Sequence, residues 1–238
     1  MRSGDRSGRA NATGKLGVSP ASLIALWLSL KVAVVATAVN AIIGIPIAYL
    51  LARRRFWGRS LVDLLVTLPL VLPPTVVGYY LIVLLGRRGI LGGPLYQLTG
   101  WTVAFTWYAA VIAATVMALP LLVRTVHAAI ESVDRDLERA AHTLGRSEFR
   151  TALEVTLPLA RNGVLAGLVL TFARALGEFG ATLMLAGNIP GRTATVPLSI
   201  YTAVQTGDSG EALVLVAALT LLSCAVLVAA NRLGARAT

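Results

Sequence analysis

The chain has 238 residues, of which 56% are hydrophobic and only 13% are charged, and its mean hydropathy is +0.76. This composition is that of a membrane protein rather than of a soluble domain. The net charge of +10 does not indicate a nucleic-acid partner, because the arginines flank apolar runs and lack interleaved aromatic residues. A single cysteine, Cys224, excludes an internal disulfide and a cysteine-cluster metal site.

The chain begins with a basic stretch. Residues 1–20 are rich in glycine and serine and show no hydrophobic periodicity, so they are predicted to form a disordered tail ahead of a single transmembrane domain over residues 21–238. A secretory signal peptide is not expected, because Arg53, Arg54 and Arg55 follow the first apolar run in place of a small-residue cleavage site.

Five apolar segments are long enough to cross a bilayer as helices. They cover about residues 23–51, 61–85, 103–123, 163–186 and 212–230. The first is longer than a bilayer requires and contains Lys31, so we expect residues 32–52 to cross while Lys31 extends its amine to the headgroup region. The predicted fold class is therefore an all-α integral membrane protein with about five transmembrane helices.

The second apolar segment carries Pro73 and Pro74 near its middle. Proline removes a backbone donor and crowds the preceding turn, so part of this segment should be bent or unwound. Irregular backbone at membrane depth persists only where protein or a water-filled cavity covers it. The prolines therefore mark either a simple kink or a bent helix that lines a transport path.

The connections between the spans predict the topology. Residues 86–100 form a glycine-rich loop, and residues 188–211 form a longer polar connection with a short amphipathic helix near 197–204. Five spans place the two termini on opposite sides. Four Lys/Arg lie in residues 53–59, six in 124–161 and two after the last span, against three in the other loops, which favours an outer N-terminus and a cytoplasmic C-terminus. The four basic residues of the N-terminal tail depart from this rule.

The longest strongly charged segment, residues 131–158, lies between two apolar runs. Its periodicity predicts two short helices, the first capped by Ser132, with Asp134 in its first turn, and ended by Gly145. Pro158 lies where the chain is expected to turn back toward the membrane. The pattern is compatible with a solvated linker or with an element that docks on a soluble partner.

The spacing of this segment resembles a known motif. Ala140 and Ala141 are followed after three residues by Gly145, and after nine more by the run from Val155 to Pro158. This arrangement is similar to the E-A-A-x3-G-x9-I-x-L-P loop of bacterial ABC importer permeases, in which the loop docks on the ATPase subunit. The sequence departs at the first position, where Arg139 replaces the glutamate and Glu138 precedes it. The resemblance implies an ATPase-coupling loop within residues 125–161, without deciding which of Glu138 and Arg139 makes the polar contact.

Few side chains could carry chemistry. Arg174 and Glu178 are four residues apart within an apolar segment and so share a helix face, either as a structural ion pair or as a polar point on a transport path or gate. His127 and His142 are fifteen residues apart and have no further ligand beside them, so they do not predict a metal site. Gly14-Lys15 is followed by leucine, so no P-loop is present. We expect no catalytic group and no cofactor in this chain.

The likeness to a family extends over most of the chain. The runs PLVLPPTVVGYYLIVLLGRRG, TWYAAVIAATVMALPLLVR and FARALGEFGATLMLAGNIPGRTATVPLSIYTAVQT closely resemble the molybdate ABC permease family. The resemblance implies a MetI-like permease in a bacterial inner membrane that transports molybdate as a homodimer. Its implied partners are an ABC ATPase subunit, a periplasmic or extracellular molybdate-binding protein, a second copy of the chain and the lipid bilayer.

The sequence is also compatible with three other functions. A sulfate, thiosulfate or tungstate permease would share the architecture, because ARALGEFG and NIP are similar in the sulfate branch. A secondary transporter or channel is a second class, although no internal repeat is evident. A membrane enzyme is the third, and it would need a water-activating group beyond the Arg174 and Glu178 pair.

Overall fold

The computed structural model describes residues 19–235, and over that range the protein is helical with no strand. Within residues 19–235, three helices are long and apolar enough to cross a membrane: α1 (Pro20–Arg53), α5 (Trp107–Glu131) and α12 (Ser209–Ala235), the last over Ser209–Val228. Two bent helix pairs raise the number of spans to five if each pair is one crossing. The predicted all-helical membrane fold is confirmed.

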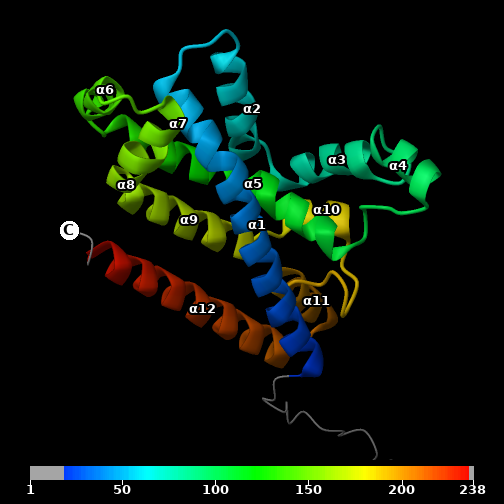
Figure 1. Ribbon diagram of the computed structural model, residues 1–238. Helices are drawn as coiled ribbons and strands as arrows, with labels where there is room; N and C mark the ends of the chain where they lie inside the picture. The colour runs from blue at the N-terminus through cyan, green and yellow to red at the C-terminus, as the bar shows by residue number, and fades with distance from the viewer. Residues whose placement is uncertain (1–18, 236–238) are drawn as a thin grey trace, which may run out of the picture.

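The helix α1 is the longest element and runs the length of the molecule (Figure 1). Ser19 caps it by accepting a hydrogen bond from the Ser22 N–H at 3.1 Å, and Pro20 occupies the first helical position, where its missing N–H costs nothing. The expected tail over residues 1–20 is therefore wrong at its last residue, and residues 1–18 lie outside the described part. The helix continues through Lys31 and Pro46 to Arg53.

The core lies where α1 packs against α5 and α9 (Arg161–Leu176). Small side chains from α1 and α5 are fully buried at this contact, including those of Ala33, Ala36, Ala110 and Ala114. Inside a membrane, where lipid competes for apolar surface, such small residues let helices approach closely enough for dispersion contacts to hold them. Asn40 adds a polar contact by donating to the Thr115 carbonyl at 3.2 Å.

The second apolar segment is two helices, α2 (Arg59–Val71) and α3 (Pro74–Leu85), and the chain bends by 119° between them. Leu72 and Pro73 are extended between them. The expected disturbance at Pro73 and Pro74 is present, and it is a break rather than a kink. The helix α3 turns away from α2, packs against α10 and leads to α4 (Gly92–Thr99), a helix inside the segment that is expected to be a loop (Figure 1).

The fourth apolar segment is also broken. The helix α9 ends at Leu176, and α10 (Gly180–Ala186) begins after three residues. The next helix, α11 (Val196–Thr206), confirms the short helix expected near residues 197–204. The start of α12 lies beside the start of α1, where Ser22 donates a hydrogen bond to Glu211 at 2.7 Å (Figure 1).

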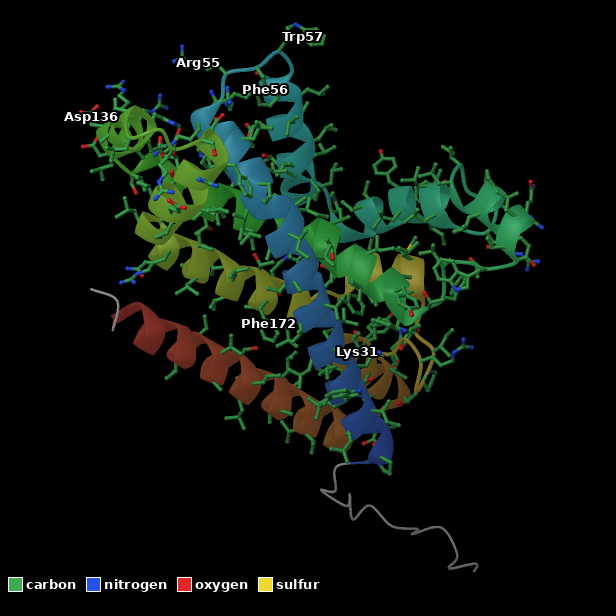
Figure 2. The ribbon with its side chains drawn as sticks, in the orientation of Figure 1. Lys31, Arg55, Phe56, Trp57, Asp136 and Phe172 are labelled. Carbon is green, nitrogen blue, oxygen red and sulfur yellow. The ribbon has the colours of Figure 1, made fainter. Side chains whose placement is uncertain are left out.

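Between α5 and α9 the charged segment folds as α6 (Arg135–Thr143), α7 (Glu148–Thr151), a π-helical turn, η1 (Ala152–Thr156), and α8 (Leu157–Leu159). The helix α5 continues to Glu131, so residues 125–131 belong to a long helix rather than to the expected loop. Asp136 lies at the same end of the molecule as the turn that carries Arg55 and Trp57, whereas Lys31 lies toward the other end (Figure 2).

Candidate functional site

The first helix of the charged segment is capped at both ends. Asp134, rather than the expected Ser132, is the N-cap of α6, and its carboxylate accepts from the Asp136 N–H at 2.9 Å. Ser132 instead ends α5. The expectation for Gly145 is confirmed: it adopts a φ of 81°, and its N–H donates to the His142 carbonyl at 2.9 Å. This left-handed turn closes the helix at low cost because glycine has no Cβ.

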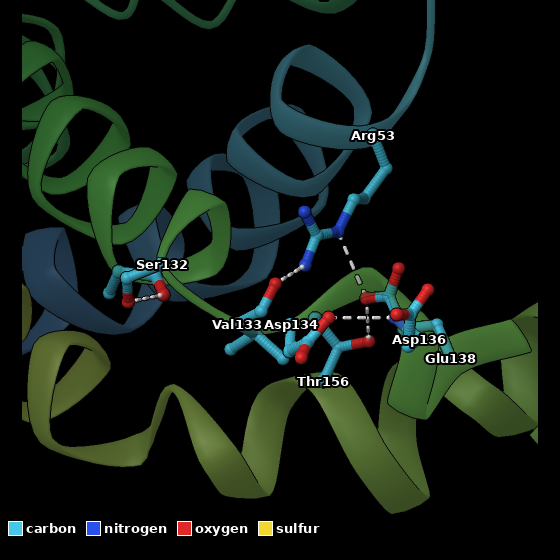
Figure 3. Close-up of polar contacts among 8 residues, drawn as sticks. Arg53, Ser132, Val133, Asp134, Asp136, Glu138 and Thr156 are labelled. Carbon is cyan, nitrogen blue, oxygen red and sulfur yellow. Dashed lines mark hydrogen bonds and ion pairs between the residues drawn. The ribbon is translucent and has the colours of Figure 1, made fainter. Parts of the chain in front are cut away.

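Glu138 points inward and joins three elements (Figure 3). Its Oε1 accepts from the Arg53 Nε at 2.9 Å and from the Thr156 Oγ1 at 2.6 Å. Arg53 also donates to the Val133 carbonyl at 2.9 Å. The Arg53 and Glu138 side chains are 6% and 12% exposed, so these charge-assisted bonds form with little competition from water. The network ties α6 and η1 to the end of α1.

Arg139, the next residue, points outward. Its side chain is 75% exposed and pairs with the equally exposed Asp136 at 2.7 Å. Large apolar side chains accompany it on the surface of the charged segment, with Leu144 83% and Phe149 73% exposed. Of the apolar residues that fall at helical spacing around α6, Val133 and Ala141 are buried, whereas Leu137, Ala140 and Leu144 are exposed. An exposed apolar surface among charged residues is characteristic of a site that binds another protein.

The second half of the charged segment contains an irregular turn. Ser147 caps α7, and η1 then widens the helix, so that the Leu157 N–H reaches back to the Ala152 carbonyl. Pro158 follows directly, and its missing N–H cannot extend the regular hydrogen-bond ladder. The chain bends by 78° between Leu159 and Arg161, which places the expected turn two residues after Pro158.

A hollow of about 410 Å³ lies between α6 and the end of α1. Its lining is net positive, because four arginines and two glutamates contribute to it: Arg53, Arg54, Arg135, Arg139, Glu138 and Glu148. Arg54 forms an ion pair with Glu148 across its rim. The hollow therefore offers a positively charged recess beside the exposed apolar surface.

Arg174 and Glu178 form the ion pair that their spacing predicts. The Arg174 Nη1 lies 2.7 Å from the Glu178 Oε2, and the Glu178 side chain is 1% exposed. The second oxygen of Glu178 accepts from the Ala181 N–H at 2.9 Å and so satisfies the first turn of α10. The carboxylate thus bridges the break between α9 and α10, while the Arg174 side chain remains 27% exposed.

The two broken helices pack against each other at their breaks. A Cβ on Gly180 would lie 2.9 Å from the Cβ of Pro74, and a Cβ on Gly78 would lie 2.9 Å from the Ala181 Cα. Such distances leave room only for glycine at positions 78 and 180. The structure therefore brings the segment of Pro73 and Pro74 together with the segment of Glu178.

Sequence reasoning missed several participants. Arg53 and Thr156 complete the Glu138 network from 85 and 18 residues away in sequence, and no local pattern indicates either contact. The contact of Gly180 with Pro74 joins residues 106 positions apart, and it too has no local signal. In the part of the chain that the structure describes, no group of three or more His, Cys, Asp or Glu side chains could hold a metal ion.

Residues 44–237 match the sequence pattern of the binding-protein-dependent transport system inner membrane component family. The molybdenum transport system permease protein ModB of Escherichia coli K12 is 48% identical over 206 residues, which cover 86% of this chain and 90% of that protein. The ModB protein of Haemophilus influenzae is 49% identical over 79% of this chain and 82% of its own. The putative molybdenum transport system permease protein YvgM of Bacillus subtilis is 41% identical over 82% of this chain and 86% of its own length.

The fold also matches solved structures of low sequence identity. An inward-facing MetNI methionine ABC transporter aligns with a TM-score of 0.72 at 20% identity and covers 93% of this chain and 98% of its own. A bacterial ABC transporter involved in import of the polysaccharide alginate aligns with a TM-score of 0.66 at 19% identity. The alignment covers 92% of this chain and 80% of that chain. At this level of sequence identity, the matches show that the helices share one fold.

Proposed function

This chain belongs to the family of binding-protein-dependent transport system inner membrane components, and on that premise we propose that it is the permease subunit of an ATP-driven molybdate importer. It is a non-catalytic, multi-pass inner membrane protein, and a separate ATPase hydrolyses the nucleotide. A substrate-binding protein delivers the oxyanion to its outer face. Two copies of the chain enclose the path between them. The extent of identity to the molybdenum permeases supports molybdate over sulfate or tungstate.

The segment 131–158 is the ATPase-coupling loop in this proposal. The observation that supports this role is that the Glu138 and Arg139 side chains point in opposite directions, one into the protein and one into solvent. Glu138 is held inside by Arg53 and Thr156, whereas Arg139 lies outside beside exposed apolar side chains. A loop that is anchored on one face and apolar on the other can transmit force, because a push on α6 reaches α1 through a rigid contact. Arg139 is then the side chain available for a polar contact with the ATPase.

The loop is assigned to the cytoplasm, with the N-terminus outside and the C-terminus inside. Residues 53–59 and 131–158 contact each other through the Arg53 and Glu138 pair, so they share one side of the membrane. Ten of the basic residues lie in residues 53–59 and 124–161, four in the first and six in the second. The positive-inside rule supports a cytoplasmic location for both.

The packed breaks at Pro74 and Gly180 are the gate in this proposal. Broken helices within a membrane occur where protein or water covers the backbone. The Arg174 and Glu178 pair positions the start of α10, and the partly exposed Arg174 faces the path of a dianion. ATP binding draws the two coupling loops together and opens the path outward, and hydrolysis restores the inward-open state. ATP need only bind one of these conformations more tightly than the other.

The test is uptake of labelled molybdate into proteoliposomes that contain the chain, its ATPase and its binding protein. The decisive variant is Gly145→Asp, which places a carboxylate on the coupling surface. Aspartate tolerates the left-handed backbone, and no atom lies within 4 Å of the added Cβ, so α6 should stay folded. Gly100→Asp is the matched control, because Gly100 has a φ of 69° with equally open surroundings outside the loop.

We expect the wild type to take up molybdate only with ATP, and excess sulfate should not inhibit this uptake. The Gly145→Asp variant should lose both molybdate uptake and co-purification with the ATPase. Gly100→Asp should retain the ATPase. Equal competition by sulfate would retain the architecture and reassign the substrate. Uptake without ATP would refute the importer, and retention of the ATPase by Gly145→Asp would refute the coupling role of the loop.

A further inference from the structure

A pocket of about 430 Å³ lies between the N-terminal part of α1, the first turn of α5 and the segment before α11. Two cations, Lys31 and Arg192, line it together with apolar and aromatic side chains that include Ile24, Trp27 and Trp107. Among the residues that the structure describes, no carboxylate contributes to its lining. The pocket is thus positive at one edge and apolar at the other.

The two cations of this pocket are available to a ligand. The Lys31 Nζ lies 3.7 Å from the centroid of the Trp107 ring, so its ammonium is fixed over the pocket while its N–H donors remain free. Among residues 19–228, no carboxylate forms an ion pair with Lys31 or Arg192. The pocket also lies at the N-terminal end of α5, where the helix dipole favours an anion, and Thr106 already accepts the Ala109 N–H there.

The depth of the pocket matches a lipid headgroup. Lys31 and Arg53 are on one continuous helix, and the roughly 22 residues between them span about 33 Å. The hydrocarbon core of a bilayer is about 30 Å thick. With Arg53 at the level of the 131–158 loop, Lys31 therefore lies at the phosphate level of the opposite leaflet, and Figure 2 places it in the part of α1 far from Asp136. Trp27, 68% exposed, lies about one helical turn further from Arg53, within the interfacial region where tryptophans gather.

We propose that this pocket binds an anionic phospholipid in the leaflet opposite the 131–158 loop. The phosphate lies between Lys31 and Arg192, and an acyl chain runs from there toward the bilayer centre past the exposed ring of Tyr108. A lipid fits better than a small free oxyanion, because Lys31 lies at the depth of the lipid phosphates and the half-exposed Tyr108 offers ring surface that a small dianion leaves uncovered. The lipid would fasten the start of α1 to the start of α5, two elements that the Lys31 and Trp107 contact already joins.

Native mass spectrometry of the full-length chain in detergent tests the proposal, with phosphatidylglycerol and phosphatidylcholine as probes. We expect the wild type to prefer phosphatidylglycerol. Lys31→Gln and Arg192→Gln should each lower the affinity for phosphatidylglycerol about fivefold, and the double variant should lower it about 25-fold. The affinity for phosphatidylcholine should change little in all three variants. Arg88→Gln is the matched control, because it removes an exposed arginine outside the pocket and should leave the preference intact.

Three results would overturn the proposal. One is an equal affinity of the wild type for the two lipids. Another is a preference that survives in the double variant or is lost equally in Arg88→Gln. The third is displacement of phosphatidylglycerol by millimolar molybdate, sulfate or inorganic phosphate, which would make the pocket a site for free oxyanions. Arg192 is exposed on a loop, so the Arg192→Gln variant should fold normally. This variant alone therefore tests the pocket if a change at Lys31 disturbs α1.

Discussion

Replacing Glu138 with alanine should release α6 from the end of α1. The change leaves the Arg53 guanidinium, whose side chain is 6% exposed, without its carboxylate, and the buried Thr156 without its acceptor. Removing one partner of a buried ion pair costs about 3–5 kcal/mol. Glu138 is 12% exposed and water can replace part of the contact, so we expect the lower end, about 3 kcal/mol.

Hydrogen exchange of the α6 amides measures this loss, because those amides exchange when the helix detaches. About 3 kcal/mol corresponds to roughly 100-fold faster exchange. Arg139→Ala is the matched control on the same helix, and its exposed pair with Asp136 should change exchange by no more than about threefold. Equal effects of the two alanine variants, or unchanged exchange in Glu138→Ala, would refute the assignment of Glu138 as the internal anchor.

Three further predictions concern the glycines and the membrane ion pair. Gly180→Ala should destabilise the purified chain by about 1–3 kcal/mol in thermal unfolding, because the new Cβ meets Pro74, whereas Gly177→Ala, whose Cβ has only one contact at 3.7 Å, should be nearly neutral. Gly145→Ala should accelerate α6 exchange by an amount equivalent to about 1–2 kcal/mol, and Gly145→Asn should do so less, since asparagine tolerates a positive φ. Glu178→Gln keeps an acceptor for the start of α10 but unpairs its arginine, so uptake or assembly should fail; normal uptake and expression would remove this residue from the gate.

Most local features of the fold could be predicted from the sequence. The apolar segments, the end of α6 at Gly145 and the helix α11 each follow from hydropathy, periodicity or turn residues that act over a few positions. Errors occurred where neighbouring signals compete. Ser132 and Asp134 both suit an N-cap, and the choice between them depends on how far α5 extends, which is decided by its packing.

The amino-acid sequence by itself determined that this protein is helical, lies in a membrane and carries a capped, charged loop, because composition and spacing are properties of the local chain. Only the tertiary structure decided that Glu138 faces inward and Arg139 outward, and that the break at Pro74 meets the break at Gly180. The reason is physical. Residues far apart in sequence become partners only after the helices pack, and the orientation of a polar side chain depends on which of those partners removes it from water.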